Sequence, residues 1–188
     1  ANDIKTRNAD VVILAVGADP VMPKIPGIDH TKTVSCIDAL LKNKPIGNKV
    51  VVVGGGLVGC ETAIEYAMEG KDVTIVEALD AIMSSGLPVP IMNQMMVNLQ
   101  IAEHGVKVHT GCRIAAINDN GAVITTADGK EEELPADTVV MSIGFKPVPS
   151  MASELYGAGM EIYQIGDGRR VGNIQSAIWD AYEVARSL

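Results

Sequence analysis

Short apolar runs alternate with helically spaced apolar positions along most of the chain, which is the pattern of a parallel α/β fold. We expect strands at 10–17, 49–53, 72–76, 106–110, 137–144 and 161–165, and those at 10–17, 49–53 and 137–144 should be buried. Helices are predicted at 36–42, 60–70 and 91–104, and from Ile174 to Leu188. In the helix at 91–104, one face carries the apolar side chains of Ile91, Met95, Leu99 and Ala102.

Residues 112–134 follow a different pattern, in which short alternating runs are separated by turn residues. The turn signals are Asp119-Asn120-Gly121 and Asp128-Gly129. This pattern predicts an antiparallel β-meander inserted into the parallel fold.

A strand that ends in glycine and leads into a proline-rich segment occurs twice, at 10–26 and at 137–149. The two segments bracket a self-contained region. We therefore expect an inner domain at 34–147, flanked by two segments, 1–33 and 148–188, that belong to one other domain.

Composition narrows the class of protein. Of 188 residues, 47% are hydrophobic and 20% are charged, as in globular chains. The net charge of −8 argues against nucleic acid or an anionic membrane as a partner. No apolar run approaches the roughly 20 residues of a membrane span, and no signal peptide is visible, so we expect a cytoplasmic protein. The three cysteines lack metal-ligand spacing, so we expect reduced, buried thiols and no metal site.

A glycine motif follows the predicted strand at 49–53 and opens the next helix. Its residues are Gly54, Gly55, Gly56, Leu57, Val58 and Gly59. In a dinucleotide-binding turn, the first glycine permits the tight turn, the second lets the backbone approach a pyrophosphate, and the third lets the helix pack on the strand. The N-terminus of the helix then favours an anion. The motif therefore predicts a Rossmann-like dinucleotide site, with a plain glycine-rich turn as the alternative.

Glu77 ends the second strand of this unit, near the spacing expected for the acid that binds the adenosine ribose. A 2′-phosphate at that place would be repelled by the carboxylate. The next residues, Ala78-Leu79-Asp80, offer no Arg or Lys to receive it. The sequence therefore favours NADH over NADPH.

Together with four longer stretches, these residues carry a family resemblance. The stretches are ADVVILAVGADPVMPKIPGID, VVVVGGGLVGCETA, LPADTVVMSIGFKP and IYQIGDG. The chain resembles the two-dinucleotide-binding-domain flavoproteins, the pyridine nucleotide–disulfide oxidoreductase-like family. Within it, the chain is most similar to the C-terminal part of NADH:flavin oxidoreductases of the 2,4-dienoyl-CoA reductase and enoate reductase type.

In such proteins, an NAD domain is inserted into an FAD domain. The resemblance implies that 34–147 is the NAD(H)-binding domain, and that 1–33 and 148–188 are two segments of a partial FAD-binding domain. It also implies contacts with FAD from Gly17, Gly166, Asp167, Ile174 and Gln175, with Asp167 holding the ribityl chain and the helix at Ile174 facing the flavin.

Two more residues are placed near the nicotinamide by the resemblance alone, Gly144 and Glu61. For Glu61 the alternative is a solvated helix residue in a row with Glu65 and Glu69. No other catalytic residue is predicted, because direct hydride transfer needs no acid–base side chain.

The first FAD-binding glycine motif of the family is absent from the chain, and so is the redox-active cysteine pair. The resemblance implies the NADH-binding module of an enzyme that passes a hydride from NADH to FAD. It also implies that FMN, an iron–sulfur cluster and the substrate-reducing domain lie in N-terminal domains not present here. The chain alone would be an inactive fragment that can self-associate. The alternatives are a non-catalytic ADP-binding module, an NADH oxidase or a ferredoxin reductase.

Overall fold

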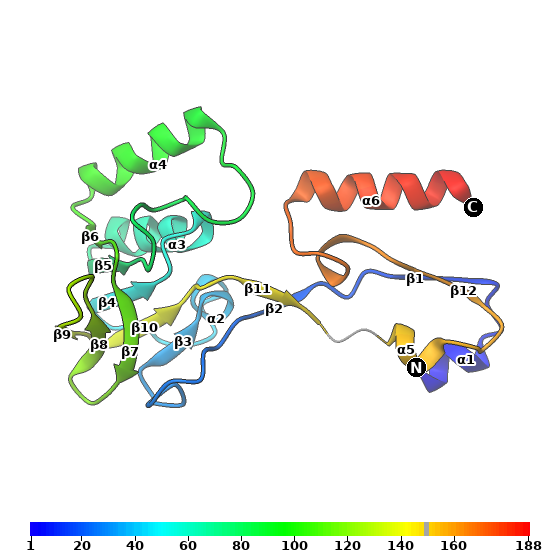
Figure 1. Cartoon of the computed structure of the whole chain (residues 1–188), viewed down its shortest axis with the longest axis horizontal. Helices are drawn as coiled ribbons and strands as arrows, with labels where there is room; N and C mark the ends of the chain where they lie inside the picture. The colour runs from blue at the N-terminus through cyan, green and yellow to red at the C-terminus, as the bar shows by residue number, and fades with distance from the viewer. Residues whose placement is uncertain (149–150) are drawn as a thin grey trace. The chain divides into compact units, whose positions relative to one another are not determined.

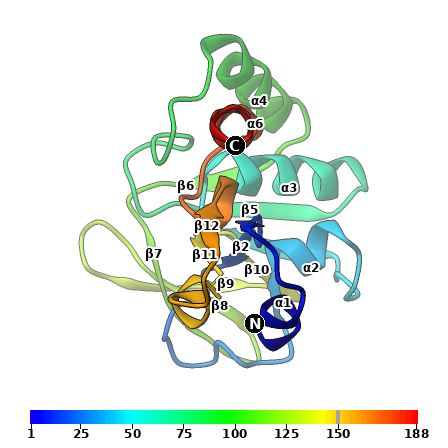
Figure 2. The same ribbon diagram turned by 90° about the vertical axis from the view of Figure 1, so that its right-hand side faces the viewer.

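The computed structural model describes residues 1–148 and 151–188, and the end of the second proline-rich segment, at residue 149, lies outside them. The chain forms two compact units: one comprises Ala1–Asp19 and Phe145–Leu188, and the other comprises Pro20–Gly144. We call them the outer unit and the inner unit, respectively. Figures 1 and 2 show their elements in two views.

A five-stranded parallel sheet in the order β3-β10-β4-β5-β6 forms the centre of the inner unit. Its strands are β3 (Thr33–Ser35), β4 (Lys49–Val53), β5 (Asp72–Val76), β6 (Lys107–His109) and β10 (Thr138–Met141). The helices are α2 (Cys36–Leu40), α3 (Leu57–Met68) and α4 (Ile91–Glu103). Val50, Val51, Val52 and Val53 are all buried, because the middle strand is covered on both faces.

The predicted meander forms an antiparallel sheet of β7 (Arg113–Ile117), β8 (Gly121–Thr125) and β9 (Glu131–Pro135). Its Ile117, Ala122 and Ile124 pack in one core with Val51 and Met141 of the parallel sheet. Figure 1 shows the meander on one face of the parallel sheet and α2 and α3 on the other. The predicted α/β fold class with an inserted meander is confirmed.

Helix α4 packs with a different face from the one that its apolar pattern suggested. Its buried residues are Val97 and Ile101. Ile91, Met95 and Leu99 are 67%, 59% and 61% exposed. Apolar side chains occur nearly all round this helix, so hydrophobic spacing alone could not single out the face that packs.

The outer unit contains one parallel pair of strands, β1 (Val11–Leu14) and β12 (Glu161–Gln164). Around it lie α1 (Asn2–Thr6), α5 (Ala152–Leu155), a 3₁₀ turn at Gly166–Gly168 and α6 (Ile174–Ser187), and β2 (Ala18–Pro20) pairs with β11 (Phe145–Pro147). The expectation of a buried strand at 10–17 is wrong for most of its length. Only Leu14 is buried, and Ile13 is 45% exposed, because the described pair has no further strand beside it.

The proline-rich segment 20–33 folds with the inner unit rather than beside it. The N–H of Val21 donates to the carbonyl of Gly144, and the N–H of Ile117 donates to that of Pro26. The compact inner unit therefore begins at Pro20, whereas the sequence placed the start of its domain at 34. In the described part of the chain, every helix is too short or too polar to span a bilayer.

Candidate dinucleotide-binding site

The turn between β4 and α3 requires glycine at two of its positions. Gly54 has a φ of +107°, and a Cβ there would lie 2.2 Å from the carbonyl oxygen of Ser142. A Cβ on Gly59 would lie 1.9 Å from the carbonyl oxygen of Gly54. The first glycine therefore makes the tight turn, and the last lets α3 pack against the end of β4.

Gly56 is different, because space surrounds it. The nearest heavy atom to a Cβ built there is the hydroxyl oxygen of Ser85, 3.9 Å away. Gly56 is also the N-cap of α3 and provides no side-chain cap. The N–H groups of Leu57, Val58 and Gly59 are the first of the helix, and the open space lies at its start, beside Gly56. A helix start of this kind attracts an anion through its unpaired N–H groups and its dipole.

Glu77 stands at the end of β5 and is only 7% exposed. Its Oε2 accepts a hydrogen bond of 2.6 Å from the N–H of Gly55. Its Oε1 accepts one of 2.8 Å from the N–H of Leu79. Each carboxylate oxygen keeps a second lone pair, which can accept a further hydrogen bond from a ribose hydroxyl.

The loop at 78–86 folds over the glycine turn. Met83 is buried, has a φ of +56°, and donates its N–H to the carbonyl of Gly55 at 2.7 Å. A Cβ on Gly55 would meet Ile82 at 2.7 Å. Met83 and Ser85 could not be predicted from the sequence, because neither belongs to a motif; their positions beside the turn arise only in the folded loop.

Gly144 lies beyond the end of β10, the neighbour of β4 on the side opposite β5. The sheet order reverses between β4 and β10, and ligands of α/β sheets bind in the crevice at such a switch point. Gly144 has a φ of +107°, and a Cβ there would meet nothing within 4 Å. The structure thus brings Gly144 to the same sheet edge as Gly54.

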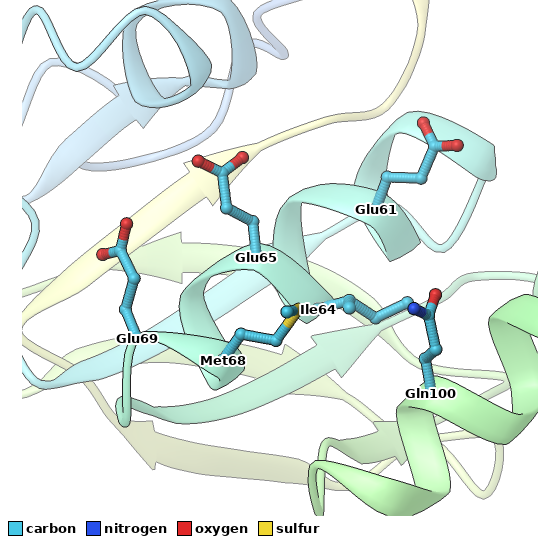
Figure 3. A pocket seen from close by; sticks show the side chains of 6 residues that line it. All are labelled: Glu61, Ile64, Glu65, Met68, Glu69 and Gln100. Atoms are coloured by element: carbon cyan, nitrogen blue, oxygen red, sulfur yellow. The ribbon is translucent and has the colours of Figure 1, made fainter.

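Glu61 lies on the exposed side of α3, in the row with Glu65 and Glu69 (Figure 3). The three glutamates line a shallow depression of about 410 Å³ with Ile64, Met68 and Gln100. Lys42 forms ion pairs with Glu65 at 3.6 Å and with Glu69 at 2.8 Å. This placement agrees with the alternative of a solvated row, and a role beside the nicotinamide stays a prediction.

Within the outer unit, the residues expected at FAD come partly together. Gly17 lies beside the 3₁₀ turn that contains Gly166 and Asp167, since a Cβ on Gly168 would be 3.3 Å from the N of Gly17. Oδ1 of Asp167 accepts a hydrogen bond of 2.9 Å from the N–H of Gly172.

Helix α6 begins with Ile174 and Gln175, which are both exposed. Its N-terminus carries a capping box, in which the N–H of Ser176 donates to Asn173 and the N–H of Asn173 donates to Ser176. The cap satisfies one helical N–H group and leaves those of Ile174 and Gln175 in the first turn for another acceptor.

The three cysteines are buried and free, as predicted. Burial, with the nearby carboxylates of Glu77 and Glu61, raises the pKa of the Cys60 thiol to about 12. Its position at the start of α3 therefore does not make it a reactive thiolate. Among the described residues, no group of three or more His, Cys, Asp or Glu side chains is arranged to hold a metal ion.

Known proteins share the whole of this architecture. A family model described as pyridine nucleotide-disulphide oxidoreductase matches residues 2–179. Cinnamate reductase of Clostridium sporogenes is 39% identical over 99% of this chain and 28% of its own length. An NADH oxidase of Thermoanaerobacter brockii is 36% identical over 98% of this chain and 29% of its own length.

A solved structure of 2-naphthoyl-CoA reductase in complex with 2-naphthoyl-CoA is also similar. It superposes with a TM-score of 0.91 at 34% identity, covering 100% of this chain and 28% of that one. The chain thus spans less than a third of the length of these relatives. They confirm the resemblance to flavoproteins of the enoate reductase type, and, since the family model matches nearly every residue, the chain belongs to the pyridine nucleotide-disulphide oxidoreductase family.

Proposed function

We propose that the inner unit binds NADH at the glycine turn, and that it serves an oxidoreductase in which the hydride of NADH passes to FAD. One observation carries this proposal. The open space at Gly56 lies at the start of α3, and the turn behind it is bonded to the acid of the neighbouring strand through Gly55 and Glu77. A plain glycine-rich turn needs neither the open space nor the acid.

The residues of the turn fit a dinucleotide. The N–H groups of Leu57, Val58 and Gly59 would receive the pyrophosphate in the space that a Cβ on Gly56 would fill. Glu77, which its two backbone donors hold in place, would accept hydrogen bonds from the adenosine ribose. Bound NADH would supply a hydride, and the protein's part is to fix its position and to keep competing groups away.

The outer unit would hold part of FAD, which accepts the hydride when it is bound. Asp167 keeps a carboxylate oxygen, Oδ2, beyond the one that accepts from Gly172, and the first turn of α6 offers N–H groups. The chain has one glycine turn of the dinucleotide type, and it lies in the inner unit. The rest of the FAD site would therefore come from a longer polypeptide.

In that longer protein, we propose that electrons continue through an iron–sulfur cluster and FMN to a domain that reduces the substrate. The similarity to cinnamate reductase and 2-naphthoyl-CoA reductase supports a reductase of this kind. The chain spans less than a third of each of these proteins, which leaves room in them for the further domains. An NADH oxidase or a ferredoxin reductase remains the alternative within the family, and proteins with those names are among the similar ones.

Calorimetric titration of the chain with NADH tests the first step. We expect one site per chain, and competition by ADP. Absence of binding by NADH and by ADP would overturn the proposal. Rapid-mixing reduction by NADH of the flavin in the longer protein tests the second step, and a flavin that stays oxidised would leave only a binding module.

That binding module is a second candidate, because the contacts of the inner unit favour the ADP half of the dinucleotide. The glycine turn would bind the pyrophosphate and Glu77 would bind the adenosine ribose. By contrast Glu61, the side chain predicted at the nicotinamide, lies in an exposed row with Glu65 and Glu69. Equal affinities for ADP and NADH, together with an unreduced flavin, would favour this candidate.

A further inference from the structure

We propose that the hydroxyl of Ser85 donates a hydrogen bond to the pyrophosphate of the bound dinucleotide. The inference rests on the proposed function, since it assigns a side chain to the same site. It adds a contact from the loop that follows Glu77, a segment in which no binding residue was predicted from the sequence.

The position of Ser85 is set by the fold of its loop. Met83, two residues earlier, is anchored by its buried side chain and by the hydrogen bond from its N–H to the carbonyl of Gly55. It has a φ of +56°, a conformation that costs free energy in a non-glycine residue and persists where the surroundings enforce it. The chain is thereby bent so that Ser85 lies over Gly56 rather than away from it.

Ser85 and its neighbour Ser84 differ in what their hydroxyl groups do. The hydroxyl of Ser84 donates to the carbonyl of Ala81 at 2.5 Å and so closes the loop on itself. The hydroxyl oxygen of Ser85 lies 3.9 Å from the Cβ position of Gly56, and the residue is exposed. Ser85 is therefore available to a ligand in the space at Gly56, and Ser84 is committed within the loop.

The chemistry of the place favours a phosphate group as the acceptor. Gly56 caps α3, so an anion at the helix start would lie in the space between the first helical N–H groups and the hydroxyl of Ser85. Glu77, which is bonded to Gly55, can only accept hydrogen bonds in its ionised form, so it suits the hydroxyl groups of a ribose and not a phosphate. Ser85 supplies a side-chain donor on the side of Gly56.

The test compares Ser85→Ala with the matched control Ser84→Ala and with Ser85→Thr, which keeps the hydroxyl. Each variant is titrated with NADH and with ADP, and adenosine is used as a competitor that lacks phosphate. A hydrogen bond to a charged acceptor predicts about tenfold or greater weakening of NADH and ADP binding by Ser85→Ala. Adenosine binding should stay unchanged, Ser84→Ala should weaken the binding of NADH and ADP much less than Ser85→Ala does, and Ser85→Thr should restore most of the affinity.

The other outcomes separate this inference from the proposed function. If the unaltered chain binds neither NADH nor ADP, the proposed function fails with it. If the unaltered chain binds and Ser85→Ala binds equally well, only the inference fails. It also fails if Ser85→Ala weakens adenosine as strongly as ADP, or if Ser84→Ala has the same effect, since a general change of the loop would then explain the loss. Circular dichroism of each variant checks the fold.

Discussion

The carboxylate of Glu77 accepts a hydrogen bond from the backbone N–H of Gly55 across 2.6 Å, so the acid at the end of β5 is bonded to the turn at the end of β4. The other carboxylate oxygen accepts a hydrogen bond from the N–H of Leu79, the second residue of the loop that covers the turn. One buried side chain thus fixes the glycine turn, the loop and, in the proposed site, the ribose. Its binding role and its structural role are therefore coupled.

NADH should bind more tightly than NADPH by about 30-fold or more, because a 2′-phosphate would lose the hydrogen bonds to Glu77 and meet its charge. The loop at 78–86 contains no Lys or Arg that could receive the phosphate. Titration calorimetry with both nucleotides measures the preference, and Glu77→Gln should narrow it by removing the charge. Equal affinities in the unaltered chain would contradict the assignment of Glu77.

Replacing Glu77 with Ala should also destabilise the inner unit without any ligand. The N–H groups of Gly55 and Leu79 would lose the carboxylate that accepts their hydrogen bonds. Each of these groups that water cannot reach lowers the free energy of unfolding by about 1–3 kcal/mol. Urea unfolding of the unliganded protein measures this loss. Glu61→Ala, on the exposed side of α3, is the matched control and should change the free energy of unfolding little.

Substitution by valine should have different effects on folding at two glycines of the same turn. Gly56→Val places its side chain in open space, so the fold should persist while the site for the pyrophosphate is filled. Gly59→Val drives a side chain into the carbonyl of Gly54, where a Cβ already comes within 1.9 Å, and should prevent folding. Circular dichroism and NADH titration distinguish the two. Normal NADH binding by folded Gly56→Val would place the site elsewhere.

Periodicity and turn residues predicted the parallel strands, α3 and the meander, because these elements are determined by local sequence patterns. The strand 49–53 and the acid at Glu77 were found from spacing alone. The fold of the loop at Met83 could not be predicted, since its left-handed backbone is imposed by a contact with Gly55 that is distant in sequence. The packing face of α4 was predicted wrongly for a similar reason, because its packing against α3 helps to decide which of its apolar sides is covered.

The Cys60 thiol should not react with a thiol reagent in the folded protein. Burial and the charges of Glu77 and Glu61 raise its pKa from 9.0 to about 12, so almost no thiolate forms near neutral pH. The folded state holds the neutral thiol, so its contribution to stability is present below pH 9 and is lost as the pH rises from 9 toward 12. In Cys60→Ala, the free energy of unfolding should fall less between pH 9 and 12 than it does in the unaltered chain, as measured by urea unfolding. Rapid labelling of Cys60 in the folded chain would contradict the assignment.

The chain by itself should associate through the apolar face of α6 and should carry no tightly bound flavin. Ile174, Ile178 and Trp179 on this helix are 81%, 63% and 56% exposed, and exposed apolar faces of this kind favour association. The described strand pair β1 and β12 has no further strand at either edge, which also invites pairing.

Sedimentation should show concentration-dependent association that Ile178→Glu reduces. Met95→Glu on the exposed face of α4 is the control for a general effect of charge. The chain contains one tryptophan, Trp179 on α6, so its fluorescence reports directly on whether this face becomes covered as the concentration rises. Association that Met95→Glu abolishes and Ile178→Glu leaves intact would assign the contact to α4. A stoichiometric flavin absorbance in the purified chain would contradict the expected need for a longer polypeptide.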